Sequence, residues 1–342
     1  MRRALELARA HRSRTYPNPR VGCVLLAPDG TLVAEGEHRG AGTPHAEAVA
    51  LAAAGDAARG TTAVVTLEPC NHTGRTPPCA EALVAAGVAR VVVAQTDPNP
   101  QAAGGADRLR AAGVDVETGV LADESSDLNR AWTHAVSTGR PFVTWKLAAS
   151  LDGRSAAADG SSRWITGSDA RRDVHRLRAE CDAVLVGTGT VLADNPRLTV
   201  RDADDRPLPA DEQPLRVVLG ESDVPAGAAV LDDAAPSLQL RTRDPHEALA
   251  TLAAREVRHV WLEGGPHVAG AFVAAGLVDE VVAYVAPALL GAGTAALETD
   301  AFATIADAVR LRTTDVALLG DDVRITARPL RASHRPTRGA DH

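Results

Sequence analysis

The residues best suited to chemistry are a histidine, a glutamate and two cysteines in the first quarter of the chain. His45-Ala46-Glu47 is followed by Pro69-Cys70 and then by Cys79. One imidazole and two thiolates are three ligands of the kind that Zn²⁺ prefers, which leaves the fourth tetrahedral position for water. The sequence therefore predicts a catalytic zinc site, with one ion per chain, rather than a closed structural one.

Glu47 is not a ligand in this prediction. Zinc lowers the pKa of a bound water to about 7, so that hydroxide is available near neutral pH. Hydroxide can attack a ring carbon that carries an amino group, and a nearby carboxylate can move the proton to the ring nitrogen and the leaving amine. The pattern thus predicts a deaminase of an aminopyrimidine-like ring. The alternative is a helix-entry histidine and two ordinary buried cysteines, which the combination with Glu47 disfavours.

The elements around these residues alternate between strands and helices, which predicts a layered α/β sandwich. His45 and Glu47 begin an expected helix, Cys70 follows an expected strand, and Cys79 opens a helix whose N-terminus favours a thiolate. We therefore expect the cluster at one edge of the sheet. In this half, strands are expected over 21–27, 32–37, 63–67, 91–94 and 114–117, and helices over 2–11, 46–54, 79–86, 106–112 and 127–138.

Gly139-Arg140-Pro141 interrupts the helical pattern and predicts a domain boundary, with domains over 1–140 and 141–331. The polar tail 332–342 is predicted to be disordered, and the Asp- and Pro-rich stretch 201–214 to be a surface loop. The second half is also predicted to be α/β, with strands over 142–148, 183–186, 216–219, 257–262 and 281–285 and helices over 169–179 and 267–275.

Composition narrows the class of protein. The 342 residues are 45% hydrophobic and 23% charged, as in globular proteins of two domains. With 36 Lys and Arg against 44 Asp and Glu, the net charge of −8 excludes the basic footprint of a nucleic-acid binder. There is no signal-peptide core, no apolar run of membrane-spanning length and no cysteine pattern of a disulfide scaffold. We expect a cytoplasmic enzyme of small molecules, in which Cys23 and Cys181 only pack.

Longer motifs point to one family. Eight residues separate Cys70 from Cys79, where the general deaminase signature has two. The chain resembles the bifunctional deaminase/reductase of bacterial riboflavin biosynthesis over nearly its whole length, to about residue 330. The motifs that carry the resemblance are Pro69 to Cys79, Tyr16-Pro-Asn-Pro-Arg-Val-Gly22, Asp97-Pro-Asn-Pro100, Lys146-Leu-Ala-Ala-Ser-Leu-Asp-Gly153, Trp164-Ile-Thr166, Thr190-Val-Leu-Ala-Asp-Asn-Pro196 and Glu263-Gly-Gly-Pro266.

The resemblance implies a cytidine-deaminase-like three-layer sandwich followed by a dihydrofolate-reductase-like α/β domain. It implies that the first half deaminates 2,5-diamino-6-(5-phosphoribosylamino)pyrimidin-4-one, and that the second half uses NADPH to reduce the ribosyl group of the product to ribityl. Asn18, His72 and Arg75 would line the deaminase pocket, with Arg75 on the substrate phosphate. Asn18 between prolines is also a common turn residue. We further expect a homo-oligomer, either a dimer or a tetramer.

The resemblance also implies a reductase site. Lys146 would contact the ribose oxygens, while Asp194 and Glu263 would polarise the reacting region. A glycine-rich turn before a helix can present N–H groups to a diphosphate, and the implied cofactor contacts are Ala148, Trp164, Thr190, Asp194, Ser222, Gly264, Gly265, Pro266, His267, Val268, Ala269 and Gly270. The implied substrate contacts are Ser162, Arg178, Leu198, Arg201 and Glu263. The alternatives are that Trp164 is a core residue, Asp194 a turn residue and the arginines solvated helix faces.

Two positions depart from the family pattern. Gly220-Glu221-Ser222 stands where the family usually has Asp-Ser with an arginine soon after. This region is expected near the adenosine end of the cofactor, so the choice between NADPH and NADH stays open. Asn195 replaces a usual second aspartate, which we expect to be tolerated.

Two other functions are considered. The first is a monofunctional deaminase of nucleobases or tRNA with a non-catalytic C-terminal binding domain; the net charge and the eight-residue spacing disfavour it. The second is a structural zinc protein with a ligand-sensing C-terminal half. A closed structural site would have no use for Glu47.

Overall fold

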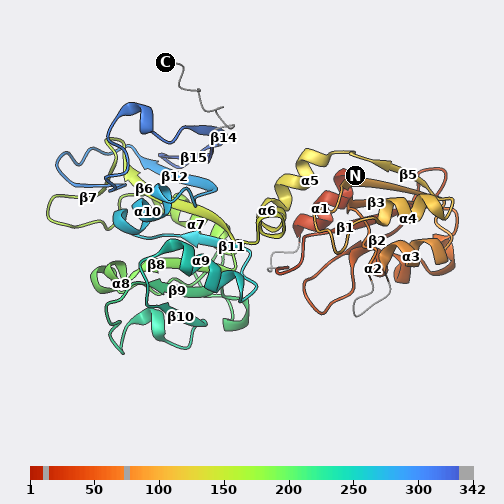
Figure 1. The fold of residues 1–342 in the computed structure, drawn as a ribbon, viewed down its shortest axis with the longest axis horizontal. Coiled ribbons are helices and arrows are strands. Elements are labelled where there is room, and N and C mark those ends of the chain that lie inside the picture. The colour runs from red at the N-terminus through yellow and green to blue at the C-terminus, as the bar shows by residue number, and fades with distance from the viewer. Residues whose placement is uncertain (11–14, 73–77, 331–342) are drawn as a thin grey trace, which may run out of the picture. The chain divides into compact units, whose positions relative to one another are not determined.

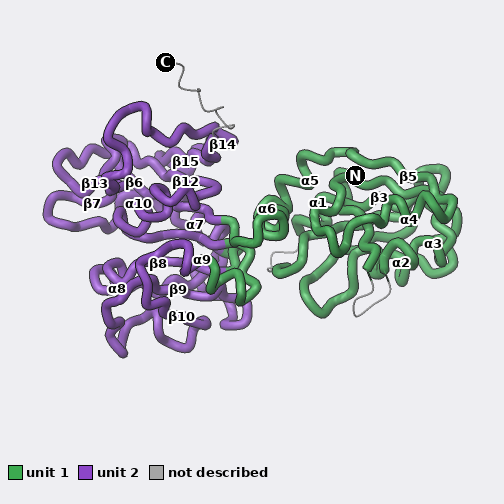
Figure 2. Tube along the Cα trace, in the orientation of Figure 1, with its two compact units in different colours: residues 1–142, 179–182, 249–259 green, residues 143–178, 183–248, 260–342 purple. Residues whose placement is uncertain are grey.

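The chain forms two compact units in a computed structural model that describes residues 1–10, 15–72 and 78–330. The first unit comprises Met1–Phe142 together with Ala179–Asp182 and Leu249–His259 (Figure 2). The second comprises Val143–Arg178, Ala183–Ala248 and the described residues from Val260 onward. Each unit is built on its own main sheet. The predicted disordered tail, 332–342, lies outside the described residues.

The first unit is built on a five-stranded sheet in the order β2-β1-β3-β4-β5 (Figure 1). β1 runs antiparallel to β2 and β3, while β3, β4 and β5 are mutually parallel. The central strands are buried on both faces, which accounts for their continuous apolar sequences. The strands are β1 Gly22–Leu26, β2 Leu32–Glu37, β3 Thr62–Leu67, β4 Arg90–Gln95 and β5 Asp115–Thr118.

Helices cover both faces of this sheet. Cys23 and Leu25 of β1 pack in the main core with α2, α3 and α4, while Val24 points to the opposite face and packs with Ala4 of α1. This alternation follows from the two-residue period of a strand. The three-layer α/β sandwich expected for this half is therefore confirmed. The helices are α1 Arg2–Ala10, α2 Ala46–Ala54, α3 Cys79–Ala85, α4 Gly105–Ala111, α5 Ala122–Leu128 and α6 Arg130–Thr138.

The single helix expected over 127–138 is wrong in one respect, because two helices, α5 and α6, meet at Asn129. The buried Asn129 amide accepts a hydrogen bond from the backbone N–H of Arg20 at 2.8 Å and donates one to its carbonyl at 2.9 Å. An asparagine that bonds to distant backbone in this way does not favour a continuous helix. The break thus depends on a contact between residues 109 positions apart.

The second unit contains an eight-stranded sheet in the order β10-β9-β8-β11-β6-β12-β15-β14. β10, β9, β8 and β11 are mutually parallel, β6 and β12 are parallel to each other, and β15 and β14 are antiparallel to their neighbours. The expected α/β architecture is confirmed. Its strands are β6 Phe142–Ser150, β8 Ala183–Gly187, β9 Leu215–Leu219, β10 Ser237–Leu240, β11 His259–Leu262, β12 Glu280–Ala286, β14 Leu311–Leu319 and β15 Asp322–Pro329. A separate pair joins β7 Arg154–Ala156 to β13 Thr294–Ala295.

Several elements of this unit were not predicted. The helices are α7 Ser168–Arg178, α8 Thr188–Asp194, α9 Pro245–Ala253 and α10 Pro266–Ala274, and sequence patterns indicated only α7 and α10. α8 begins Thr188-Gly189-Thr190, residues of low helix propensity. β14 is exposed along most of its length and has a bulge between Thr313 and Asp315, so it lacks the alternation of a half-buried strand. Its sequence therefore resembles a loop.

The strand expected over 142–148 is longer in the structure, so Lys146 stands in the middle of β6. The strand continues to Ser150 because it pairs in parallel with β12 as far as Ser150 and Ala286. The side chain of Lys146 is half-buried rather than positioned at a loop mouth.

Candidate active sites

His45, Cys70 and Cys79 come together in the first unit, as the sequence predicts. Their ligand atoms all lie within 4.8 Å of one another. Nδ1 of His45 is 3.3 Å from Sγ of Cys79 and 3.7 Å from Sγ of Cys70. His45 is the N-cap of α2, Cys70 follows β3, and Cys79 is the first residue of α3. One nitrogen and two sulfur donors at this separation fit a zinc ion.

Two glycines let the backbone bring these ligands together. A Cβ atom at Gly36 of β2 would collide with the carbonyl oxygen of Ala46, in the first turn of α2. A Cβ atom at Gly105, where α4 begins, would collide with the carbonyl oxygen of Pro69. Only glycine permits both close approaches, so each glycine fixes the position of the segment next to a ligand.

Hydrogen bonds among the two thiols and the imidazole shift the pKa values of the thiols in a way that suits metal binding. The pKa of the Cys70 thiol is lowered to about 4, mainly by the hydrogen bond from Cys79 and, against the effect of burial, by the one from His45. The pKa of the Cys79 thiol is raised by the same contact and by burial. These opposite shifts favour a Cys70 thiolate that accepts a hydrogen bond from the Cys79 thiol. Zinc binding would release the Cys79 proton, since both cysteines coordinate as thiolates.

Glu47 lines the same pocket and is only 3% exposed. Burial raises its pKa, because a carboxylate loses hydration there. A carboxylate with a raised pKa is a stronger proton acceptor, which suits a group that takes up a proton and passes it on. The geometry therefore suits the role that the sequence predicts for Glu47.

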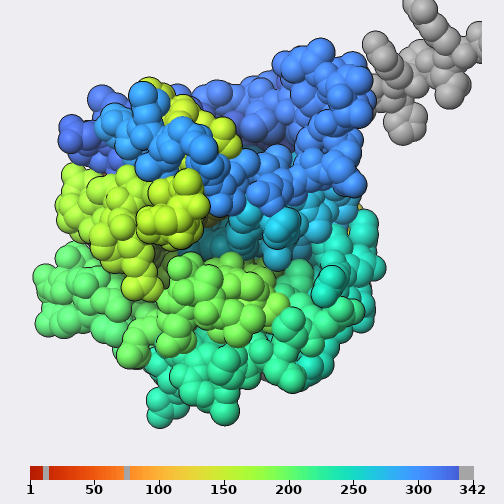
Figure 3. All heavy atoms as spheres, turned by 90° about the vertical axis from the view of Figure 1, so that its left-hand side faces the viewer, coloured from red at the N-terminus to blue at the C-terminus, as the bar shows by residue number. Residues whose placement is uncertain are grey.

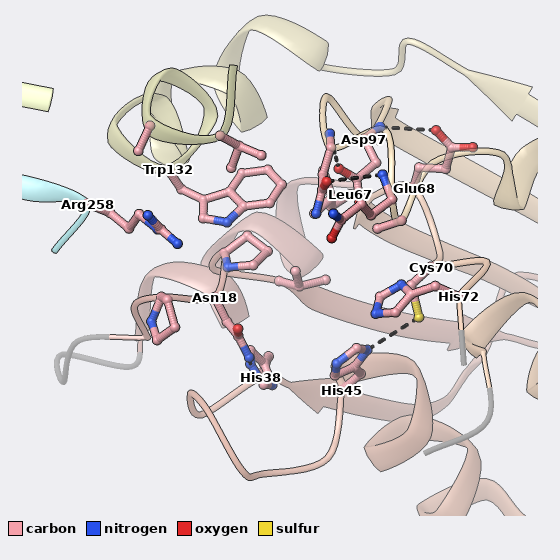
Figure 4. A pocket seen from close by; sticks show the side chains of 18 of the residues that line it. Asn18, His38, His45, Leu67, Glu68, Cys70, His72, Asp97, Trp132 and Arg258 are labelled. Carbon is pink, nitrogen blue, oxygen red and sulfur yellow. Dashed lines mark hydrogen bonds between the residues drawn. The ribbon is translucent and has the colours of Figure 1, made fainter. Parts of the chain in front are cut away.

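The cluster opens into a cavity of about 510 Å³ (Figure 4). Asn18 lines it, as predicted, and its amide nitrogen lies 3.0 Å from Nε2 of His38. Nδ1 of His38 lies 3.0 Å from the carbonyl oxygen of Pro44. Since a carbonyl only accepts, Nδ1 donates to Pro44, and Nε2 accepts from Asn18. This arrangement leaves the Asn18 oxygen as the acceptor for a ring N–H group. Sequence reasoning missed His38, because no spacing pattern links it to the cluster.

A second missed group lies on the opposite wall of the cavity. Asp97 and Asn99 line it, and burial raises the pKa of Asp97 to about 6. The buried carboxylate of Glu68 accepts hydrogen bonds from the backbone N–H groups of Asp97 at 3.0 Å, Gly104 at 3.2 Å and Ala106 at 2.9 Å. The motif Asp97-Pro-Asn-Pro100 had marked this segment as family-specific, so a site signal was present. His72 also lines the cavity, whereas Arg75 lies outside the described residues.

In the second unit, Glu263 and Arg178 form a buried pair. Oε1 of Glu263 accepts hydrogen bonds from Nε and Nη2 of Arg178 at 2.9 and 2.6 Å, and from the Trp261 indole nitrogen at 2.5 Å. Burial raises the pKa of Glu263, but Arg178 and Lys146 lower it overall. Burial lowers the pKa of Lys146, against the attraction of Glu263. Three of the charged residues predicted for the reductase site therefore lie close enough together for Arg178 to affect the pKa values of both Lys146 and Glu263. Trp261 was missed, although its two-residue spacing from Glu263 places both on one side of the strand.

Glycines line the carboxyl edge of the same sheet. Cβ atoms at Gly187, the last residue of β8, and at Gly264, after β11, would lie 2.7 and 2.8 Å from the Val268 side chain. At Gly220, after β9, a Cβ would lie 2.5 Å from the Thr188 hydroxyl. Close backbone turns before the N-terminus of α10 are suited to a cofactor diphosphate. Figure 3 shows a hollow on this face of the unit, between the yellow-green segment around β7 and the green segment around α8.

The other predicted residues of the second unit differ in their solvent exposure. Trp164 is 71% exposed with the Arg171 guanidinium 4.4 Å from its ring centre, so the alternative that it is a core residue is wrong. Thr190 lies near Gly265, where a Cβ would be 3.6 Å from its hydroxyl. Asp194, Ser222 and His267 are exposed, Ala148, Ser162, Arg201, Pro266 and Val268 are half-buried, and Leu198, Ala269 and Gly270 are buried.

Two further observations bear on those residues. A Cβ at Gly270 would collide with the carbonyl oxygen of Glu298, so this glycine packs against the 298 segment. Arg201 pairs with Asp205 at 3.0 Å. Across the residues that the structure describes, no helix combines the length and apolar character needed to cross a membrane.

Comparison with known families assigns the two halves separately. Residues 1–95 match the model of the cytidine and deoxycytidylate deaminase zinc-binding region, and residues 141–325 match that of the RibD C-terminal domain. The chain is 50% identical over 324 residues to the riboflavin biosynthesis protein RibD of Mycobacterium tuberculosis H37Rv, covering 94% of each. It is 43% identical to RibD of Escherichia coli K12, covering 94% of this chain and 96% of that one.

Solved structures agree with this assignment. RibD of Acinetobacter baumannii superposes with a TM-score of 0.88 at 42% identity, covering 96% of this chain and 98% of that one. A diaminohydroxyphosphoribosylaminopyrimidine deaminase/5-amino-6-(5-phosphoribosylamino)uracil reductase of Thermotoga maritima gives 0.87 at 34% identity, covering 96% and 97%. The matches extend across both units, and the chain belongs to the RibD family of bifunctional deaminase/reductases of riboflavin biosynthesis.

Proposed function

We propose that residues 1–140 deaminate 2,5-diamino-6-(5-phosphoribosylamino)pyrimidin-4-one and that residues 141–331 reduce the ribosyl group of the product to ribityl with NADPH. The observation that carries the first step is the convergence of His45, Cys70 and Cys79 beside the buried Glu47. The name of the T. maritima relative supports the choice of both substrates.

For the deaminase step, His45, Cys70 and Cys79 would hold a zinc ion. The bound ion supplies an activated water at neutral pH. Glu47 would move one proton of the attacking water to the ring nitrogen and a second from the same oxygen to the amine, so that the ring carbon gains the water oxygen and loses ammonia. The Asn18 carbonyl oxygen accepts a hydrogen bond from the ring and orients it, because His38 already occupies the Asn18 amide nitrogen.

In the reductase step, NADPH supplies the hydride. Lys146 binds the ribose oxygens and Glu263 orients the sugar, with its carboxylate fixed by Arg178. Thr190 and the Gly264-Gly265 turn hold the diphosphate, and Asp194 and Trp164 contact the cofactor from the exposed side of the cleft. This grouping is supported by the effects of Arg178 and Lys146 on the pKa of Glu263, and of Glu263 and Arg178 on the pKa of Lys146.

Both steps can be tested on the full chain. We expect about one zinc ion per chain, release of ammonia from the diaminopyrimidine, and stoichiometric NADPH oxidation with the deaminated ribosyl compound. A protein that releases ammonia but oxidises no reduced nicotinamide would support the monofunctional alternative. A protein without zinc after purification in zinc-replete medium would contradict the deaminase assignment.

We also propose a homo-oligomer in the cytoplasm, where its phosphorylated substrate and NADPH are found. The support for self-association is β14, an exposed edge strand whose Leu318 is 77% exposed and whose Val316 is also exposed. Unpaired edge strands with apolar side chains favour pairing with another chain. Leu318→Lys should lower the molar mass of the oligomer measured by light scattering. An unchanged molar mass would show that β14 does not form the contact between chains.

A further inference from the structure

Two arginines stand at the carboxyl edge of the second unit, where β10 ends and before α9 begins. Nη2 of Arg241 donates to Oδ1 of Asp223 at 2.7 Å, and Nη1 donates to the carbonyl oxygen of Glu221 at 3.2 Å. Nε of Arg243 lies 3.1 Å from Oε2 of Glu221. Their side chains are 60% and 78% exposed, so both guanidinium groups are open to a ligand.

The sheet order relates this pair to the cofactor cleft. Lys146 on β6 and Glu263 after β11 mark the reacting end, and the glycines at the carboxyl ends of β11, β8 and β9 mark the diphosphate path. A dinucleotide that follows this edge away from β6 brings its adenosine end over β9 and β10. Because neighbouring strands lie about 4.8 Å apart, β9 is roughly 10 Å beyond β11, two strand spacings along the sheet.

We propose that Arg241 and Arg243 bind the 2′-phosphate of NADPH and make the reductase select NADPH over NADH. This inference rests on the proposed use of a reduced nicotinamide dinucleotide by the second unit. It addresses the choice that Gly220-Glu221-Ser222 leaves open in the sequence.

The chemistry of the pair fits a phosphate monoester. Such a group carries between one and two negative charges at pH 7, and guanidinium groups bind it through paired hydrogen bonds. Ser222 lies in the same loop and has a hydroxyl group. Its backbone carbonyl oxygen accepts a hydrogen bond from Nε2 of Gln239 at 3.1 Å. Without a ligand, Glu221 and Asp223 hold the arginines at the edge. Exposed ion pairs of this kind are weak, so a more highly charged phosphate displaces the carboxylates readily.

The competing arrangement uses the same loop differently. In many dinucleotide-binding folds an acidic residue after a strand accepts a hydrogen bond from the 2′-hydroxyl of NADH. Glu221 has that position after β9. Two guanidinium groups beside Glu221 favour the phosphate, because their charges offset those of Glu221 and Asp223.

Binding of cofactor fragments separates these arrangements without any turnover. The zinc-loaded full chain is titrated calorimetrically with 2′,5′-ADP and with 5′-ADP, which differ only by the 2′-phosphate. We expect the wild type to bind 2′,5′-ADP at least about tenfold more tightly, as hydrogen bonds to charged groups imply. Arg241→Ala and Arg243→Ala should each lower the affinity for 2′,5′-ADP about fivefold and leave the affinity for 5′-ADP unchanged.

The control is Arg255→Ala, which removes an exposed positive charge outside both sites and should bind both fragments as the wild type does. The double variant Arg241→Ala/Arg243→Ala should bind the two fragments equally. A double variant that keeps the preference for 2′,5′-ADP would overturn the proposal. A wild type that binds 2′,5′-ADP and 5′-ADP equally would also overturn the proposal. In that case, weaker binding of 5′-ADP by Glu221→Gln would identify Glu221 as the residue that contacts the ribose.

The proposed reductase function fails in a different way. If the wild type oxidises NADH as fast as NADPH with the ribosyl substrate, the reductase stands and the arginine inference falls. If it oxidises neither but binds 2′,5′-ADP through the two arginines, the inference stands and the proposed reduction falls.

Discussion

The indole nitrogen of Trp261 donates a 2.5 Å hydrogen bond to Oε1 of Glu263, two residues further along the same side of the strand. The same oxygen accepts both hydrogen bonds from Arg178. The indole ring itself is almost fully buried, so its position is fixed by packing. One carboxylate oxygen is thus held by protein donors, and Oε2 is the atom that the proposed reductase function assigns to the sugar.

Trp261→Phe tests whether the indole N–H orients the Glu263 carboxylate or whether the ring only packs. The substitution removes the indole N–H donor and keeps an aromatic ring in the core. We expect the KM for the ribosyl substrate to rise about fivefold, in line with the loss of one hydrogen bond to a charged group. The affinity for 2′,5′-ADP and the deaminase rate should stay unchanged. A fall in all activities together would mean that Trp261 acts only through folding.

Glu47→Gln tests the proton carrier. The amide keeps the size of the side chain but cannot take up a proton, so deamination should fall at least about a hundredfold. Zinc content, measured by elemental analysis, should equal that of the wild type, and NADPH oxidation with the already deaminated substrate should continue. A variant that deaminates at the wild-type rate would refute the role of Glu47.

Removal of zinc should divide the two activities. A chelator is expected to stop ammonia release and to leave NADPH oxidation intact, since the predicted ligands all lie in the first unit. Zinc affinity of the stripped protein should rise with pH, because the Cys79 proton must leave on binding. Competition with a chromogenic chelator at several pH values measures this, and a flat profile would contradict a protonated Cys79 thiol.

Asp97→Asn should change stability in a pH-dependent way. The folded-state pKa of about 6 lies above the ordinary value of 3.8, so the unfolded chain releases this proton first as pH rises. The wild type therefore loses stability relative to the variant between pH 4 and 6, and the difference is constant above pH 6. After allowance for screening we expect about 1–2 kcal/mol in favour of the variant at pH 7.

Thermal unfolding of both proteins at pH 4, 5, 6 and 8 measures this difference. The variant keeps an Oδ1 atom to accept the hydrogen bond from the Asn99 N–H, which the wild type has at 2.8 Å. The two proteins should therefore have closely similar melting temperatures at pH 4. An equal difference at every pH would show that packing, not ionisation, distinguishes them.

Local signals in the sequence predicted most of the elements that position the zinc ligands. The helix over 46–54 and the strand over 32–37 were predicted with their observed bounds, because apolar runs and turn residues delimit both. The break at Asn129 and the strand β14 were not predictable in this way. The first depends on a distant backbone partner, and the second is defined by pairing with β15 rather than by burial.

The site residues also fall into those that the sequence predicts and those that depend on contacts in the folded chain. His45, Glu47, Cys70 and Cys79 were identified from residue type and spacing, since metal chemistry restricts both. His38 was not, because its role depends on contacts with Asn18 and Pro44 that only the folded chain creates. Glu68 and Trp261 likewise act through hydrogen bonds, and no spacing rule encodes them.

The carboxylate of Glu68 joins two parts of the pocket that the sequence separates by almost thirty residues. It immediately precedes the Pro69-Cys70 turn, and it anchors the 97–106 segment through three backbone hydrogen bonds. The residue that leads into a predicted zinc ligand therefore also holds one wall of the cavity in place. In a cell short of zinc, the substrate wall would keep its shape while deamination stopped, and the reductase half would receive no product.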